Sequence, residues 1–106
     1  MNDLGLTEKQ KKQIQKILMR YPAVESVRVF GSRAKGNFTK RSDLDLVAFG
    51  KSIDRFIVSE ILLDFDDLDV PFRIELQNHN TIKNQQLKEH IKRVGVEFYR
   101  KKCQNK

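Results

Sequence analysis

Two short segments of the chain carry side chains whose types and spacing could do chemistry. Residues 30–36 read Phe-Gly-Ser-Arg-Ala-Lys-Gly, and residues 42–46 read Ser-Asp-Leu-Asp-Leu. In a strand, Asp43 and Asp45 would project from the same face, about 7 Å apart at the backbone. Neighbouring carboxylates raise one another's pKa unless a cation neutralises them, and hard oxygen ligands suit Mg²⁺. The pair therefore predicts a magnesium site, with a solvated acidic strand start as the alternative.

The glycine-serine turn predicts a place for a phosphate. Residues 27–30 are mostly β-branched or aromatic and predict a short strand, whereas the residues after the turn favour a helix. A helix start offers unpaired N–H groups and partial positive charge, and Gly31 permits close backbone approach. Ser32 adds a hydroxyl, and Arg33 and Lys35 add positive charge. The alternative is an ordinary turn with surface cations, and the spacing excludes a Walker A loop.

Together the two segments resemble the signature of the polymerase-β-like nucleotidyltransferase superfamily, in which Gly-Ser is followed by Asp-x-Asp. The fuller string is similar to that of the minimal nucleotidyltransferase branch, whose members usually carry Arg where this chain has Lys35. The superfamily places a third carboxylate on a later strand, which Glu75 matches, although the branch more often has Asp there. The resemblance implies that Asp43, Asp45 and Glu75 are catalytic and hold two Mg²⁺ ions. The nucleotide-binding residues that it implies are Gly31, Ser32, Arg33, Lys35 and Ser42.

The residues around Glu75 support its role independently of the resemblance. Strand alternation puts Ile74 and Leu76 on one face and leaves Glu75 on the other. The alternative is an exposed edge-strand Glu paired with a nearby cation. Four other acids are weaker candidates, because acidic groups at helix ends and in turns are usually solvated: Asp64, Asp66, Asp67 and Asp69. Neither His79 nor His90 has a second ligand at metal spacing, so both are expected to be structural.

Hydrophobic periodicity predicts the elements that must position these groups. Thr7 opens a capping box, and apolar residues then recur at helical spacing until Pro22. A second helix follows Gly50, and Asn84 caps a third that Gly95 closes. Strands are expected over 27–30, 43–49, 72–76 and 96–99. The fold class is therefore α/β (α+β), a small mixed sheet with helices packed on it, in a single nucleotidyltransferase domain over residues 1–106.

Composition limits the compartment and the kinds of partner that we expect for the protein. The chain has 106 residues and a net charge of +7, with 39% hydrophobic and 33% charged residues. No apolar stretch approaches the ~20 residues of a membrane span, and residues 1–4 show no signal-peptide pattern. Cys103 is the only cysteine, which fits a reducing cytoplasm. The charge is compatible with nucleic acid or an acidic protein, but the lack of interleaved aromatic residues disfavours RNA.

The resemblance extends to the antitoxin half of two-gene toxin-antitoxin pairs, in which a HEPN ribonuclease is the toxin. It implies transfer of AMP from ATP to a toxin tyrosine. Such a small chain lacks the subdomains with which larger nucleotidyltransferases grip an acceptor, so we expect a partner to complete the site, which is compatible with an oligomer or hetero-oligomer. Two alternatives stay open: a non-catalytic module that neutralises its partner by complex formation, and an RNA-binding or RNA-tailing domain.

Overall fold

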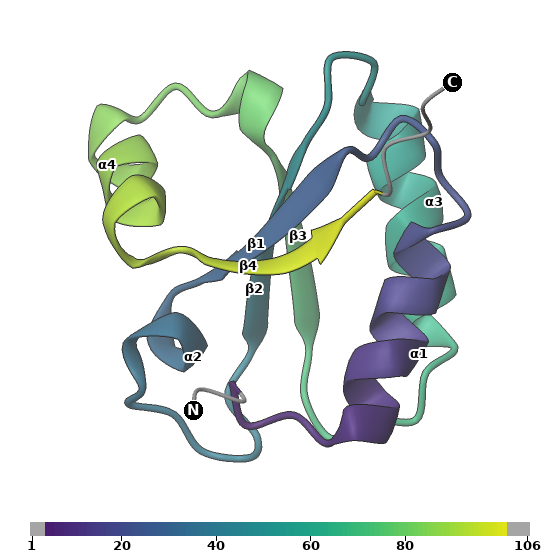
Figure 1. Ribbon diagram of the computed structural model, residues 1–106, viewed down its shortest axis with the longest axis vertical. Helices are drawn as coiled ribbons and strands as arrows, with labels where there is room; N and C mark the ends of the chain where they lie inside the picture. The colour runs from purple at the N-terminus through teal and green to yellow at the C-terminus, as the bar shows by residue number, and fades with distance from the viewer. Residues whose placement is uncertain (1–3, 102–106) are drawn as a thin grey trace.

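The strands form one four-stranded sheet in the computed structural model, which describes residues 4–101 (Figure 1). Their bounds are β1 Ser26–Phe30, β2 Leu44–Phe49, β3 Ile74–Asn78 and β4 Val96–Arg100. The order across the sheet is β3-β2-β1-β4. The β2–β3 pair is parallel, and β1 pairs antiparallel with both β2 and β4. The predicted small mixed sheet is therefore confirmed.

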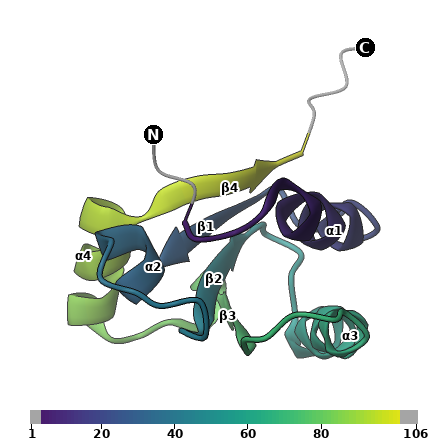
Figure 2. The ribbon, with the colours of Figure 1, turned by 90° about the horizontal axis from the view of Figure 1, so that it is seen from below.

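The helices lie on both faces of this sheet. Their bounds are α1 Glu8–Leu18, α2 Ser32–Lys35, α3 Arg55–Asp66 and α4 Gln85–Val94, with a 3₁₀ turn η1 at His79–Thr81. Figure 2 shows α1 and α3 on one side of the sheet and α2 and α4 on the other. Parallel neighbouring strands need a crossover connection, and α3 supplies it between β2 and β3.

Most predicted helix signals are confirmed, but α1 is shorter than expected. Thr7 and Gln10 form the predicted capping box, with both hydrogen bonds at 3.0 Å, and Asn84 caps α4. The first helix ends at Leu18 rather than continuing to the proline. Tyr21 instead turns toward α3, where its hydroxyl donates to a carboxylate oxygen of Asp64. Burial and this hydrogen bond raise the pKa of Tyr21 to about 12.

Two hydrophobic clusters hold the layers together. The larger lies between the sheet and the α1–α3 layer; its fully buried side chains include Ile14, Leu18, Val27, Leu46 and Ile61. The smaller lies on the opposite face and joins α4 to the sheet through Phe30, Val47, Ile82 and Ile91. Cys103 lies outside the described residues. Within residues 4–101, no helix combines the length and apolar character needed to cross a membrane.

A fully buried arginine ties the loop before β2 to α2. The Nε and Nη2 groups of Arg33 donate to the carbonyl of Ser42 at 3.1 and 2.8 Å. Nη1 donates to the carbonyl of Leu4 at 2.8 Å, and Nη2 also donates to that of Lys40 at 3.2 Å. The guanidinium lies 4.5 Å from the centre of the Phe72 ring, and burial lowers the pKa of Arg33. This network fixes the chain that leads into β2.

Replacing Arg33 should therefore make the protein easier to unfold. Arg33→Met would leave three backbone carbonyls without their buried donor, which we expect to lower the free energy of unfolding by about 2–4 kcal/mol. Urea unfolding followed by circular dichroism measures the change. Lys35→Met, on the exposed side of the same helical turn, is the matched control and should stay within about 0.5 kcal/mol of the parent. Equal unfolding midpoints for the two variants would contradict this role.

Candidate active site

The parallel pairing of β2 with β3 brings Asp45 and Glu75 side by side. The two residues are direct partners in the strand register, and on its other side Asp45 lies opposite Phe30 of β1. Paired strands are about 4.8 Å apart, and partners in register project from the same face. That face is also the one on which Val47 packs beneath α4. The structure thus places two of the three predicted catalytic carboxylates next to each other.

The charges around Asp45 act against its ionisation. Burial raises the pKa of the Asp45 carboxyl, and the negative charges of Asp43 and Glu75 raise it further. A positive charge on His90 acts in the opposite direction. A bound cation would relieve the same repulsion, so the electrostatics of the site and the chemistry of its oxygen donors both suit a divalent metal.

The three carboxylates do not converge fully in the structure. Asp43 is exposed and directly precedes β2, and Glu75 accepts from Nη1 of Arg73 at 3.3 Å. Within residues 4–101, no three His, Cys, Asp or Glu side chains gather as a metal site. The Arg73–Glu75 ion pair is solvent-exposed, and exposed pairs of this kind are worth only about 0–1 kcal/mol. Glu75 can therefore leave Arg73 and turn toward Asp45 with little loss of ion-pair free energy.

Gly31 makes room for Asp45. Its φ angle is +77°, in the region that favours glycine, and a Cβ atom here would collide with Oδ2 of Asp45. Gly31 is also the first residue before α2, so the turn and the carboxylate are packed directly against each other. Any larger residue would force either the Asp45 side chain or the turn to shift and would strain the backbone at this positive φ.

His90 of α4 contacts the turn beside this site, and the contacts that it makes agree with its predicted structural role. Its Nε2 atom accepts the Gly31 N–H at 3.2 Å, and its ring lies edge-on to Phe30. Sequence spacing held no sign of this, because 59 residues separate the two partners. The one available clue is the neighbouring Ile91, whose burial turns this side of α4 toward the sheet. The backbone donor predicted for a phosphate thus already has a partner.

The remaining predicted nucleotide ligands divide into two groups. Ser32 is half-buried, its hydroxyl makes no hydrogen bond within residues 4–101, and Lys35 is exposed, so both are available to a ligand. Arg33 is buried and bound to carbonyls, so its predicted phosphate contact is not compatible with this arrangement. The Ser42 hydroxyl accepts the Thr39 N–H at 2.8 Å, which closes a turn, and its nucleotide contact stays a prediction.

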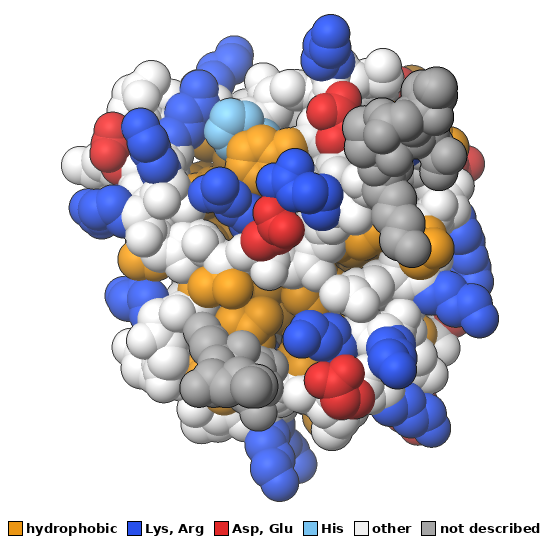
Figure 3. Space-filling view, viewed as in Figure 1, with side chains coloured by type: hydrophobic (Ala, Val, Ile, Leu, Met, Phe, Trp, Pro, Cys, Tyr) orange, Lys and Arg blue, Asp and Glu red, His pale blue; other side chains and the backbone are white. Residues whose placement is uncertain are grey.

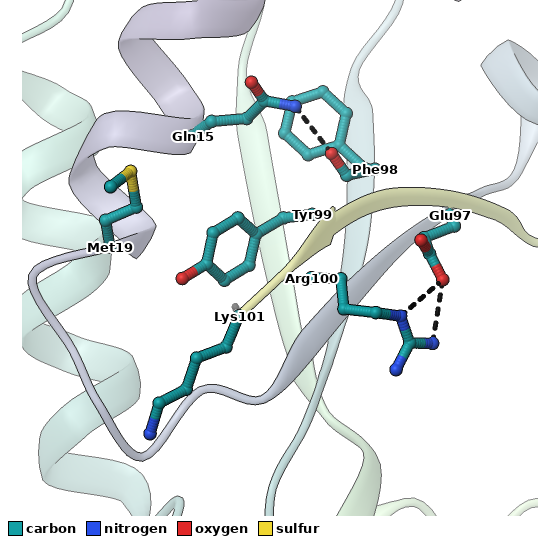
Figure 4. Close-up of a pocket in the computed structure, with 7 residues that line it drawn as sticks. All are labelled: Gln15, Met19, Glu97, Phe98, Tyr99, Arg100 and Lys101. Atoms are coloured by element: carbon teal, nitrogen blue, oxygen red, sulfur yellow. Dashed lines mark hydrogen bonds and ion pairs between the residues drawn. The ribbon is translucent and has the colours of Figure 1, made fainter. Parts of the chain in front are cut away.

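The rival acids and the largest cavity described lie elsewhere. Asp64 accepts from Arg20 and Tyr21 between α1 and α3. A hollow of about 500 Å³ lies between α1 and β4, where Gln15 Nε2 donates to the carbonyl of Phe98 at 2.7 Å (Figure 4). Its one acid, Glu97, is paired with Arg100. Both acids thus already have partners, Asp64 in Arg20 and Tyr21 and Glu97 in Arg100.

The raised pKa of Asp45 predicts a pH-dependent stability in the absence of divalent cations. The folded protein holds this proton more tightly than the unfolded chain, whose ordinary value is 3.8. Stability from this group is therefore present at low pH and is lost as pH rises from that value through the higher folded one. We expect the melting temperature of Asp45→Asn relative to the parent to increase between about pH 4 and 7 in EDTA. A difference that is constant across this range would contradict the prediction.

Comparison with known proteins agrees with the geometry. Chains of three crystal structures share the fold: a toxin-antitoxin with AMP-PNP, a tri-AMPylated Shewanella oneidensis HEPN toxin in complex with MNT antitoxin, and the toxin-antitoxin MntA-HepT. Their TM-scores are 0.68, 0.62 and 0.59, at 19%, 17% and 14% sequence identity. The matches cover 86%, 95% and 90% of this chain and 73%, 74% and 74% of those chains.

Comparison with curated protein sequences finds no match. The family model described as "Polymerase beta, Nucleotidyltransferase" matches residues 12–104, which include both motif segments and all four strands. The resemblance seen in the two motifs is thereby confirmed: the chain belongs to the polymerase beta nucleotidyltransferase family.

Proposed function

We propose that the protein is a Mg²⁺-dependent nucleotidyltransferase that moves AMP from ATP to a tyrosine hydroxyl of a HEPN-type toxin in the cytoplasm and thereby acts as an antitoxin. The observation that carries this proposal is the register of β2 and β3, which sets Asp45 beside Glu75. Gly31 adds to it, because its missing side chain lets the turn before α2 approach the Asp45 carboxylate closely.

The carboxylates would hold the metal. Asp43, Asp45 and Glu75 supply the hard oxygen donors that Mg²⁺ prefers. When bound, the ions neutralise the triphosphate and lower the pKa of the acceptor hydroxyl. Glu75 is partly exposed and can be released from Arg73, and in this proposal it takes the acceptor proton.

The turn would hold the leaving group. The Gly31 N–H, the Ser32 hydroxyl and the Lys35 ammonium are the donors that the site offers to phosphate oxygens. For the Gly31 N–H to bind phosphate, it must exchange its hydrogen bond with His90 for one with the ligand. The acceptor oxygen then forms a bond to the α-phosphorus while the bond from that phosphorus to the bridging oxygen breaks, and pyrophosphate leaves.

The choice of ATP and of a toxin tyrosine rests on the structural neighbours. Among the structures with this fold, one holds AMP-PNP and another contains a HEPN toxin that has been AMPylated, in complex with its MNT antitoxin. The matches cover about three quarters of the length of those neighbours.

A second candidate function is neutralisation by complex formation alone. It is favoured by the closed state of the site, in which the Gly31 N–H is bound to His90 and Glu75 is bound to Arg73. A domain that masks its partner needs neither group to be free. The two functions differ in whether the partner gains mass.

Replacing both aspartates should abolish transfer without unfolding the protein. Asp43→Asn/Asp45→Asn removes the oxygen charges that bind the metal, and we expect the rate to fall by at least about 10³-fold. The melting temperature in EDTA should be unchanged or higher, because the ionised Asp45 is disfavoured by its neighbours.

The measurement is intact mass spectrometry of the partner toxin after incubation with the purified protein, Mg²⁺ and each nucleoside triphosphate in turn. Addition of nucleoside monophosphate by the parent, and none by the double variant, supports transfer. A tight complex with no gain in mass by the parent supports the masking function instead. Full activity of the double variant would exclude these aspartates as the metal ligands.

The role of Glu75 can be separated from its ion pair. Glu75→Gln should lower the transfer rate by about 10²-fold or more, as expected when a group that takes a proton is removed, whereas Glu75→Asp should keep part of it. Arg73→Gln is the matched control, because it breaks the ion pair and leaves the carboxylate in place. Rates are measured at saturating ATP. Equal losses in Glu75→Gln and Arg73→Gln would show that only the ion pair matters.

A further inference from the structure

A second, positively charged pocket lies on the α4 face of the sheet. This cationic pocket has a volume of about 230 Å³; its lining residues are Arg28, Phe49, His79, Lys88, Glu89, Ile91 and Lys92. Figure 3 shows a histidine beside a hydrophobic group with Lys and Arg side chains around them. The pocket shares α4 with the carboxylate site, since His90 contacts the turn beside that site and Lys88 and Lys92 line this pocket.

The floor of the pocket is an ordered stack. The Arg28 guanidinium lies 5.8 Å from the centre of the Phe49 ring, and the His79 ring lies against Phe49 with 4.5 Å between ring centres. Arg28 is half-buried, and the Gly95 backbone at the α4–β4 junction lies close to its Cδ. The guanidinium therefore packs against Phe49, while the Glu97 carboxylate on the neighbouring strand interacts with its charge.

The cations of this pocket form no direct ion pairs, although Glu97 lies opposite Arg28 in the strand register and interacts with its charge. Within residues 4–101, no salt bridge includes Arg28, Lys88 or Lys92. The one acid in the lining, Glu89, is exposed. Lys88 and Lys92 are four residues apart and so lie on one side of α4. Three positive charges thus line a small hollow whose lining includes one acid, Glu89, with Glu97 beside Arg28.

The pKa of His79 responds to the positive charge of this pocket. Burial lowers the pKa of its imidazole, and the positive charges of Lys88 and Arg28 lower it further. An anion in the pocket would offset those charges and favour the protonated ring. Binding of an anion would therefore tighten as pH falls through the pKa of His79.

We propose that the cationic pocket is an anion-binding site that takes a phosphate group, either of a free polyphosphate or of an RNA backbone. A guanidinium and two ammonium groups match a ligand with two or more negative charges better than a single carboxylate. Because Arg28 and His79 already lie against the Phe49 ring, the site recognises charge and not a base. The inference stands independently of nucleotidyl transfer.

The test is an NMR titration of the His79 ring in the full chain without divalent cations, with inorganic pyrophosphate in one arm and a short oligouridylate in the other. We expect saturable shifts of the His79 resonances and a rise in its pKa. Tighter binding of the oligouridylate identifies RNA backbone as the source of the phosphate, and tighter binding of pyrophosphate identifies a free polyphosphate. Resonances of His90 report separately on binding at the carboxylate site.

A matched pair of double variants distinguishes binding at this pocket from general attraction of an anion to the positively charged protein. Lys88→Gln/Lys92→Gln should weaken binding about tenfold or more. Lys12→Gln/Lys16→Gln removes the same charge at the same spacing from α1 and should stay within about twofold of the parent. His79 resonances that do not shift with either ligand, or equal weakening in both double variants, would overturn the proposal.

Discussion

The parallel pairing of β2 with β3 is the constraint on which the site depends. A one-residue slip of this register would send Glu75 to the opposite face, where it would meet the core beneath α1 and α3 instead of Asp45. Apolar residues that alternate with the acids, such as Leu46 and Leu76, hold the register because they are buried on that core side. The hydrophobic effect on one face thereby positions the charges on the other.

The carboxylates of the site repel one another, and hydrogen bonds elsewhere in the fold stabilise the backbone that carries them. Asp45 packs closely against Gly31. Burial and the negative charges of the two other carboxylates disfavour its ionised form. Arg33 compensates structurally, because its buried hydrogen bonds fix the loop that leads to these acids. A basic residue of the motif, Arg33, thus stabilises the backbone. Clustering of perturbed carboxylates is typical of functional sites.

The fold was largely predictable because its signals are local. The capping box at Thr7, the Asn84 cap and the alternation around Glu75 each depend on residues a few positions apart. Errors occurred at helix ends: the first helix stops at Leu18, because Tyr21 is used to contact Asp64. The predicted phosphate contact of Arg33 failed for another reason, since a basic side chain in a turn looks the same in sequence whether it is exposed or buried.

The sequence by itself determined the family, the strand faces and the identity of the paired acids, because side-chain type and periodicity specify which face of an element a residue occupies. Only the tertiary structure decided that Arg33 is buried, that His90 reaches the Gly31 N–H and that Arg28 joins Lys88 and Lys92 around one pocket. These contacts join elements far apart in the chain. They depend on how α2 and α4 pack against the sheet, and no local pattern encodes that packing.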